Sequence, residues 1–239
     1  MRKVLLILKW ASVLALFIIV LSFTNSRQEQ QFVSLDKISV LVSEDNFVNE
    51  KIVMSYLDEN KVSFDSILLN NFKAEELEVL LEKHPSIEKV EVYANQKGNV
   101  AITVDQKKAV VRIKSIYDDY YLDEFGERMK LSSNYTPNLL VVTGEVRMSN
   151  HQEIFDFVSL INKSEFWNAQ ITQLHFKGNE VTMSPRVGDQ KIRFGCLVDV
   201  KEKLNNLYEF YKQAMPVKGW QAYSDINLKF KNQVVCTKK

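Results

Sequence analysis

The stretch DDYYLDEFGERMK, residues 118–130, gathers five carboxylates around Gly126, namely Asp118, Asp119, Asp123, Glu124 and Glu127. Such a density could hold a calcium ion or supply paired acids for general acid–base catalysis. A calcium loop of the EF-hand type needs oxygen ligands at positions 1, 3, 5 and 12 and a glycine at position 6. With Gly126 at position 6, the ligand positions hold Tyr121, Asp123, Phe125 and Ser132. Only Asp123 is a good ligand, so the stretch instead predicts two strands joined by a turn, with the acids facing solvent.

No histidine is placed for metal binding. The chain has three, His84, His151 and His175. None lies at the spacing to another histidine, cysteine or carboxylate that HExxH-type sites need. His175 falls in an apolar run that is typical of a strand. The sequence therefore predicts structural roles for the histidines and no metal site.

Two SxxK matches, Ser34–Lys37 and Ser86–Lys89, could suggest the serine nucleophile of penicillin-binding proteins. The partner motifs SDN and KTG are absent, and Ser86 follows a proline into a strand pattern instead of opening a helix. The chain also lacks GxSxG, GxxxxGK(S/T) and GxGxxG. These motifs therefore identify no catalytic constellation and indicate no cofactor.

Residues 4–24 predict a single transmembrane helix. The run from Val4 to Phe23 is apolar over 20 residues and carries one charge, Lys9. At about 1.5 Å per residue, it would cross a hydrocarbon core of about 30 Å. The positive-inside rule places the basic tip at residues 1–3 in the cytoplasm, so residues 25–36 are juxtamembrane and the rest is extracytoplasmic. The alternative is a cleaved signal peptide, but SFTNSRQ lacks a small-x-small cleavage site.

The composition limits the classes of partner that the protein is expected to bind. The chain has 239 residues, enough for one large domain or two small ones. Its 31 basic and 30 acidic residues nearly balance, which argues against a nucleic-acid-binding surface. No small-molecule site is indicated. Cys196 and Cys236, the only cysteines, could pair in an oxidising compartment or remain two buried thiols.

Residues 37–108 predict a small domain with the order β-α-α-β-β. Alternating apolar residues from Ile38 to Val42 indicate a half-buried strand. Two amphipathic helices follow, the first capped by Asn49 and the second ended by Pro85. The last two strands form a hairpin about Gly98.

Residues 109–239 predict a second, β-rich domain with two or more helices. The apolar run LLVVTG, residues 139–144, suits a central strand. HQEIFDFVSLINKS is an amphipathic helix, and Asp199 with Glu202 forms a capping pair for another. The fold class of the whole chain is therefore α+β, with the domain boundary near Lys108.

The last expected strand, Gln233–Thr237, ends the chain. A terminal strand often lies at a sheet edge, where its free N–H and C=O groups are available to a partner strand. It could equally well do no more than complete the core. If it forms a partner edge, a proline at Val234 would remove a ladder donor and weaken partner capture.

In their order and spacing, these features resemble the FtsQ/DivIB family of bacterial cell-division proteins. That family has a short cytoplasmic N-terminus, one membrane helix, a POTRA domain and a β-rich domain. LEVLLEKHPSIEKVEV is similar to its helix, His-Pro and strand passage, and KKAVVRI resembles its exit strand, with Ala109 in place of the usual proline. The most specific match is YYLDEFGERMKLSSNYTPNLLVVTG, which resembles the opening of its β domain, and INLKFKNQVV resembles its closing hairpin.

The resemblance implies a non-enzymatic divisome scaffold in the bacterial cytoplasmic (inner) membrane, located at the division septum. Its implied partners are two small bitopic division proteins, FtsB and FtsL. In the family, the final strands of the β domain accept a partner strand from FtsB. Carried over by position, this surface comprises Lys229, Phe230, Asn232, Gln233, Val234 and Val235. The POTRA domain would also engage partners, through residues that the sequence does not identify.

Two other function classes stay open at this point. One is a POTRA-containing envelope or secretion assembly factor, although no room remains for its usual β-barrel. The other is an anchored cell-wall enzyme whose site has no recognisable motif. Midcell localisation would favour a division protein over both alternatives.

Overall fold

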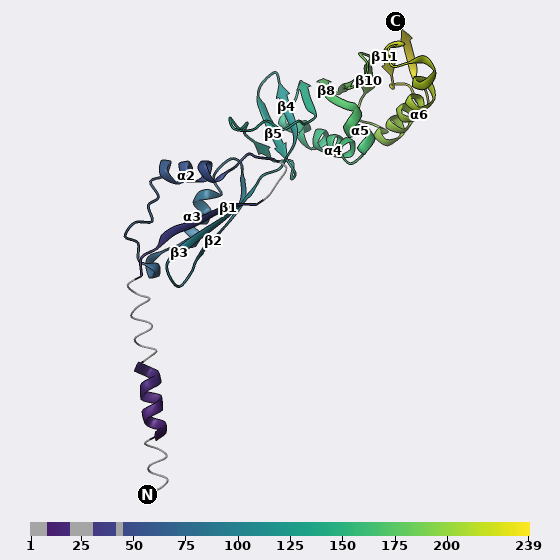
Figure 1. Cartoon of the computed structure of the whole chain (residues 1–239). Helices are drawn as coiled ribbons and strands as arrows, with labels where there is room; N and C mark the ends of the chain where they lie inside the picture. The colour runs from purple at the N-terminus through teal and green to yellow at the C-terminus, as the bar shows by residue number, and fades with distance from the viewer. Residues whose placement is uncertain (1–8, 20–30, 42–44) are drawn as a thin grey trace. The chain divides into compact units, whose positions relative to one another are not determined.

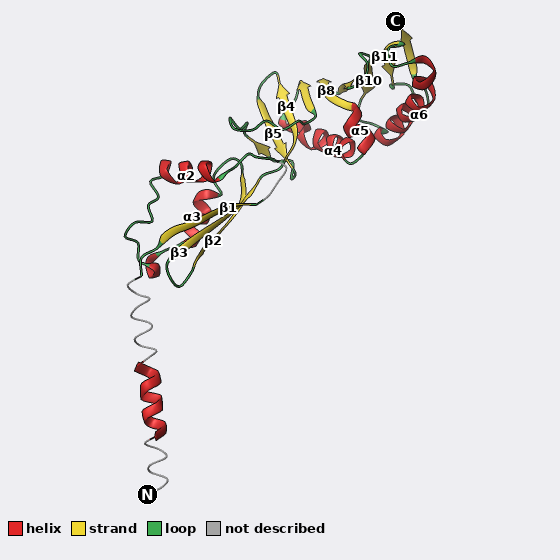
Figure 2. Cartoon of the chain, in the orientation of Figure 1, coloured by secondary structure: helices red, strands yellow, loops and turns green. Residues whose placement is uncertain are grey.

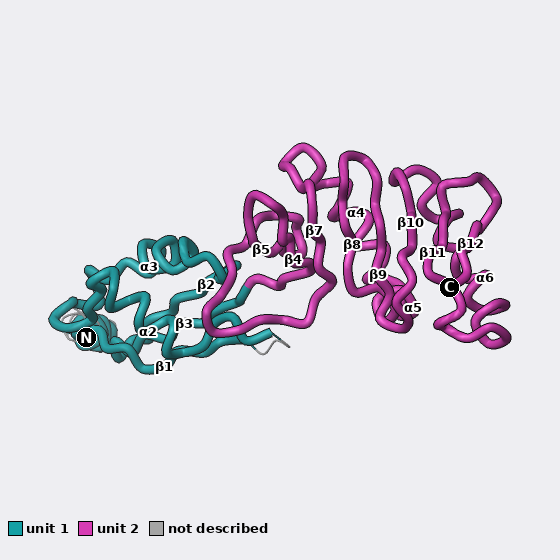
Figure 3. Tube along the Cα trace, turned by 90° about the horizontal axis from the view of Figure 1, so that it is seen from above, with its two compact units in different colours: residues 1–106 teal, residues 107–239 magenta. Residues whose placement is uncertain are grey.

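The computed structural model describes residues 9–19, 31–41 and 45–239 of the chain. It divides into two compact units, Met1–Gln106 and Lys107–Lys239 (Figure 3). We call them the N-terminal unit and the C-terminal unit.

The predicted transmembrane helix, residues 4–24, lies partly outside the described residues. Residues 9–19 are helical. Among the described residues, no helix is both long enough and apolar enough to cross a membrane. The predicted cytoplasmic tip at residues 1–3 also lies outside them.

The N-terminal unit has the predicted β-α-α-β-β order (Figures 1 and 2). Its elements are β1 (Ser34–Val40), α2 (Glu50–Glu59), a 3-10 turn (Leu69–Asn71), α3 (Ala74–Leu81), β2 (Ile87–Ala94) and β3 (Asn99–Gln106). The strand order is β1-β3-β2, with β1 parallel and β2 antiparallel to β3. The side chain of Asn49 accepts a hydrogen bond from the Ile52 N–H at 3.1 Å, which confirms the predicted cap of α2.

The C-terminal unit is built on a nine-stranded sheet. Its strands are β4 (Ala109–Ser115), β5 (Asp119–Asp123), β6 (Arg128–Met129), β7 (Val141–Gly144), β8 (Ile171–Lys177), β9 (Glu180–Pro185), β10 (Lys191–Gly195), β11 (Tyr223–Asn227) and β12 (Val235–Lys238). Their spatial order is β12-β11-β10-β9-β8-β7-β4-β5-β6. A β-rich domain with helices was predicted, and the α+β class of the chain is confirmed.

Three helices lie along one side of this sheet, α4 (His151–Asn162), α5 (Glu165–Gln170) and α6 (Val200–Lys218) (Figure 2). Each buries an apolar stripe in one core with the strands, to which Ile154, Trp167 and Leu207 belong. Helix α6 begins next to Asp199, as predicted, but the capping pair is wrong. Asp199 has φ +54° and its side chain makes no cap hydrogen bond.

The acidic stretch forms β5, a turn and β6, with Gly126 at φ +79° as predicted. Its acids do not all face solvent, however. Asp123 is only 1% exposed, because its carboxylate accepts hydrogen bonds from the N–H groups of Phe125 (3.0 Å) and Glu127 (2.9 Å). Its other oxygen, Oδ2, accepts a bond from Nζ of Lys107 at 2.9 Å. The buried Asp123 side chain therefore stabilises the turn by accepting hydrogen bonds from its amides. The local sequence did not indicate this role.

Tyr211 of α6 is buried among aromatic side chains, 5.2 Å from Trp220 and 6.2 Å from Trp167 between ring centroids. Burial raises the pKa of Tyr211 to about 12, and the side chains of Gln190 and Gln170 oppose part of the shift. An ordinary tyrosine has a pKa near 10, so the unfolded chain releases this proton first.

This shift predicts an alkaline loss of stability. The Tyr211 contribution is fully present below about pH 10 and falls as the pH rises towards 12, by about 2 kcal/mol at pH 11.5. Urea denaturation at pH 9 and pH 11.5 measures it, with Tyr211→Phe as the control that lacks the ionisable group. Equal losses in the wild type and Tyr211→Phe would contradict the assignment.

Candidate partner-binding edge

Strand β12 lies at one edge of the nine-stranded sheet, where β11 is its only neighbour among the described strands. The carbonyl of Thr237 accepts a hydrogen bond from Oγ of Ser224 at 3.3 Å, and the N–H of Lys239 donates to the Ala222 carbonyl at 3.2 Å. Residues 237 and 239 thus direct their backbone groups towards β11. Since these directions alternate along an antiparallel strand, Cys236 and Lys238 direct theirs outward.

The strand begins later than predicted. Of the six predicted partner-binding residues, only Val235 lies in β12. The others lie in the loop before it, namely Lys229, Phe230, Asn232, Gln233 and Val234. The loop turns back through Asn232, at φ +57°, and through a hydrogen bond from the Gln233 N–H to the Phe230 carbonyl at 3.3 Å. A proline at Val234 would therefore not remove a donor from this strand.

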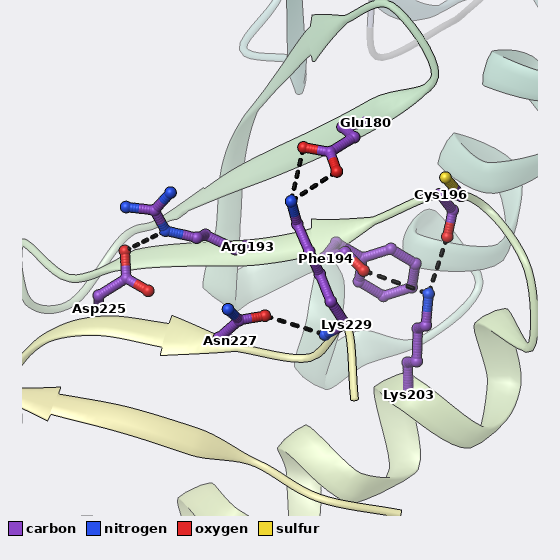
Figure 4. Close-up of polar contacts among 8 residues, drawn as sticks. All are labelled: Glu180, Arg193, Phe194, Cys196, Lys203, Asp225, Asn227 and Lys229. Atoms are coloured by element: carbon purple, nitrogen blue, oxygen red, sulfur yellow. Dashed lines mark hydrogen bonds and ion pairs between the residues drawn. The ribbon is translucent and has the colours of Figure 1, made fainter. Parts of the chain in front are cut away.

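Lys229 is exposed at the surface, but its side chain is held by contacts within the C-terminal unit. Its Nζ lies 2.5 and 2.6 Å from the two carboxylate oxygens of Glu180 on β9, and its backbone N–H donates to Oδ1 of Asn227 at 3.0 Å (Figure 4). A Cβ placed on Gly195 would lie only 2.9 Å from Cγ of Lys229, so the lysine stem lies closely over that glycine. Lys229 fixes the loop across three strands instead of presenting an isolated positive charge.

Phe230, which follows Lys229 in the loop, is exposed, with 53% of its surface accessible. Together with Lys231, Asn232 and Gln233 it lines a pocket whose other side is formed by Asp199, which precedes α6, and by Glu202 in the first turn of that helix. Next to it, Val234 and Cys236 pack against the core. The loop before β12 therefore offers an exposed aromatic ring.

Lys203 of α6 holds this helix against the end of β10. The sequence does not indicate this role of Lys203. Its Nζ donates to the carbonyls of Phe194 at 3.2 Å and Cys196 at 2.8 Å, and lies 5.0 Å from the centroid of the Phe194 ring (Figure 4). A lysine one turn into an amphipathic helix gives no local sign of such a role. Its carbonyl contacts join α6 to the end of β10.

Both cysteines are free thiols in this structure. Cys196 is exposed, whereas Cys236 is partly buried in β12. Burial raises the pKa of the Cys236 thiol, and Asp225 adds to the shift by its negative charge. Cys236 therefore favours the neutral thiol form at the edge strand.

Two family models match the chain. The model described as FtsQ/DivIB, C-terminal related, matches residues 108–237, and a POTRA-like domain model matches residues 29–105. No curated protein matches the chain.

One similar solved structure is the major extracytoplasmic domain, in its trans isomer, of the bacterial cell division protein DivIB from Geobacillus stearothermophilus. It is 14% identical and has a TM-score of 0.26, over 33% of this chain and 71% of that one. The assignment therefore depends on the family models, of which the first spans more than half of the chain. The chain belongs to the FtsQ/DivIB family of bacterial cell-division proteins.

Proposed function

We propose that the protein is a non-enzymatic, membrane-anchored scaffold of the bacterial divisome that binds FtsB- and FtsL-type proteins outside the cytoplasm. The observation that carries the proposal is the outward-facing backbone of β12 at Cys236 and Lys238. A partner strand that pairs there extends the sheet by one strand, and its backbone hydrogen bonds set the register.

Side chains around this edge supply selectivity. Val235 and Thr237 are exposed, while Cys236 between them is directed towards the core. Alternate side chains of an added strand would therefore lie beside Val235 and Thr237. Phe230, in the loop that precedes β12, offers an exposed apolar side chain that could contact a residue flanking the added strand.

Anchoring by the predicted membrane helix, residues 4–24, makes a modest affinity sufficient. A partner in the same membrane is held at a high effective concentration near the edge strand. We propose that the protein lies in the cytoplasmic (inner) membrane with its N-terminus in the cytoplasm, and at the division septum with its partners. We propose no cofactor, nucleic acid or small-molecule substrate for it.

Photo-crosslinking in dividing cells tests the proposal. A crosslinking amino acid is placed in turn along residues 224–238, with position 124 on the opposite part of the sheet as the control. We expect capture of the FtsB-type protein from positions 235 and 237 and none from position 124. Capture spread evenly over all positions, or a uniform envelope distribution of a fluorescent fusion, would contradict the proposed function.

A further inference from the structure

Strand β2 of the N-terminal unit also lies at a sheet edge, but two of its outward amides are already occupied. In the order β1-β3-β2, it pairs only with β3. The N–H of Val92 donates to Oε1 of Glu78 at 2.7 Å, and the N–H of Val90 donates to Oε1 of Glu82 at 3.3 Å. Glu78 lies in α3 and Glu82 is the residue that follows it, so one helix supplies both acceptors.

The spacing of the two glutamates fits the strand. Residues four apart on a helix are separated by about 6.0 Å along its axis, and residues two apart on a strand by about 6.8 Å. Glu78 contacts the later residue, Val92, and Glu82 the earlier one, Val90, so the helix and the strand run in opposite directions. Helix α3 packs directly on β2, which holds the carboxylates at this edge.

This arrangement changes what the edge offers to another strand. Strand pairing needs outward N–H donors and C=O acceptors in alternation. At Val90 and Val92 the donors are satisfied by carboxylates, so an incoming strand finds acceptors and negative charge where its own carbonyls need donors. At β12, by contrast, the described part of the chain places no carboxylate on the outward amides of Cys236 and Lys238.

We infer that Glu78 and Glu82 are specificity-determining residues that close the β2 edge to partner strands, so that it does not compete with β12. The importance of this closure for partner choice rests on the proposed function. The closure itself is a property of the N-terminal unit and holds whatever binds to β12.

The full chain in detergent, with Glu78→Ala and Glu82→Ala combined, tests the inference. At low protein concentration, the amides of Val90 and Val92 are expected to exchange with deuterium about tenfold faster than in the wild type, because each loses its acceptor. At high concentration, the opened edge pairs with the same edge of a second copy. The two amides regain protection, and the variant sediments as a larger species than the wild type in the same detergent.

The matched control is the combination of Glu75→Ala and Glu76→Ala. It removes two carboxylates from the same helix, but Glu76 pairs with Lys73 at 2.5 Å and neither residue bonds to β2. Exchange and sedimentation should equal those of the wild type, and a circular-dichroism melt checks that both variants fold.

Two outcomes would overturn the inference. One is wild-type exchange of the Val90 and Val92 amides in the Glu78/Glu82 variant. The other is faster exchange with no association at any concentration. Neither outcome depends on binding at β12, so failure here and failure of the proposed function are distinguishable.

Discussion

Replacing Asp123 by alanine is expected to lower the free energy of unfolding of the C-terminal unit by about 3 kcal/mol. The carboxylate is buried and accepts two backbone hydrogen bonds and one from Lys107, whose side chain is only 16% exposed. Without it, two amides of the β5–β6 turn lose their acceptor and the Lys107 ammonium loses its nearest carboxylate. Urea denaturation followed by the fluorescence of Trp167 and Trp220 measures the change.

Two further variants separate the parts of this effect. Asp123→Asn keeps an oxygen for the turn amides and removes the charge, so we expect about half of the loss. Glu124→Ala removes a neighbouring carboxylate that is exposed, and should change stability by no more than about 0.5 kcal/mol. A loss in Glu124→Ala equal to that in Asp123→Ala would show that the stretch is sensitive to charge as such and that Asp123 has no special position.

Lys238→Pro is expected to weaken binding of the FtsB-type partner by about tenfold, because it removes an outward N–H of β12. The donors that face β11, at Val235, Thr237 and Lys239, remain, so the fold should persist. Proline is tolerated at an edge strand when its missing donor points away from the sheet. Titration of the full chain in detergent with the purified partner measures the dissociation constant.

Lys238→Ala is the matched control for this variant. It removes the same side chain and charge but keeps the backbone donor, so its affinity should stay close to that of the wild type. Unchanged binding by Lys238→Pro, with a normal thermal melt, would exclude strand addition at β12. Equal weakening by both variants would assign the effect to the lysine side chain.

The sequence predicted the order of elements because that order depends on local signals. Alternating apolar residues indicated β1 and β3, the amphipathic pattern indicated α4, and Asn49 marked the start of α2. Each signal acts over a few residues along the chain, within reach of periodicity and capping rules. The position of Gly126 in its turn was predictable for the same reason.

The candidate partner-binding edge was only partly predictable from the sequence. The sequence suggested an edge position for the last strand without deciding it, and β12 does lie at an edge of the described sheet. Its first residue was wrong by two positions, because the turn through Asn232 and the packing of Val234 against the core decide where pairing begins. Which backbone groups face outward followed only from the register with β11.

Only the tertiary structure decided the environment of individual charges. The buried carboxylate of Asp123 is paired with Lys107 and with amides of the turn. The side chain of Lys229 is fixed by an ion pair with Glu180, which is 49 residues away in sequence. From the sequence alone, Glu78 and Glu82 look like ordinary polar positions of a helix. Only the folded structure shows that they accept hydrogen bonds from β2. The sequence by itself therefore determined the elements, their order and the family, since these depend on short-range patterns. The state of each sheet edge and each buried charge depends on contacts between distant segments, which exist only once the chain has folded.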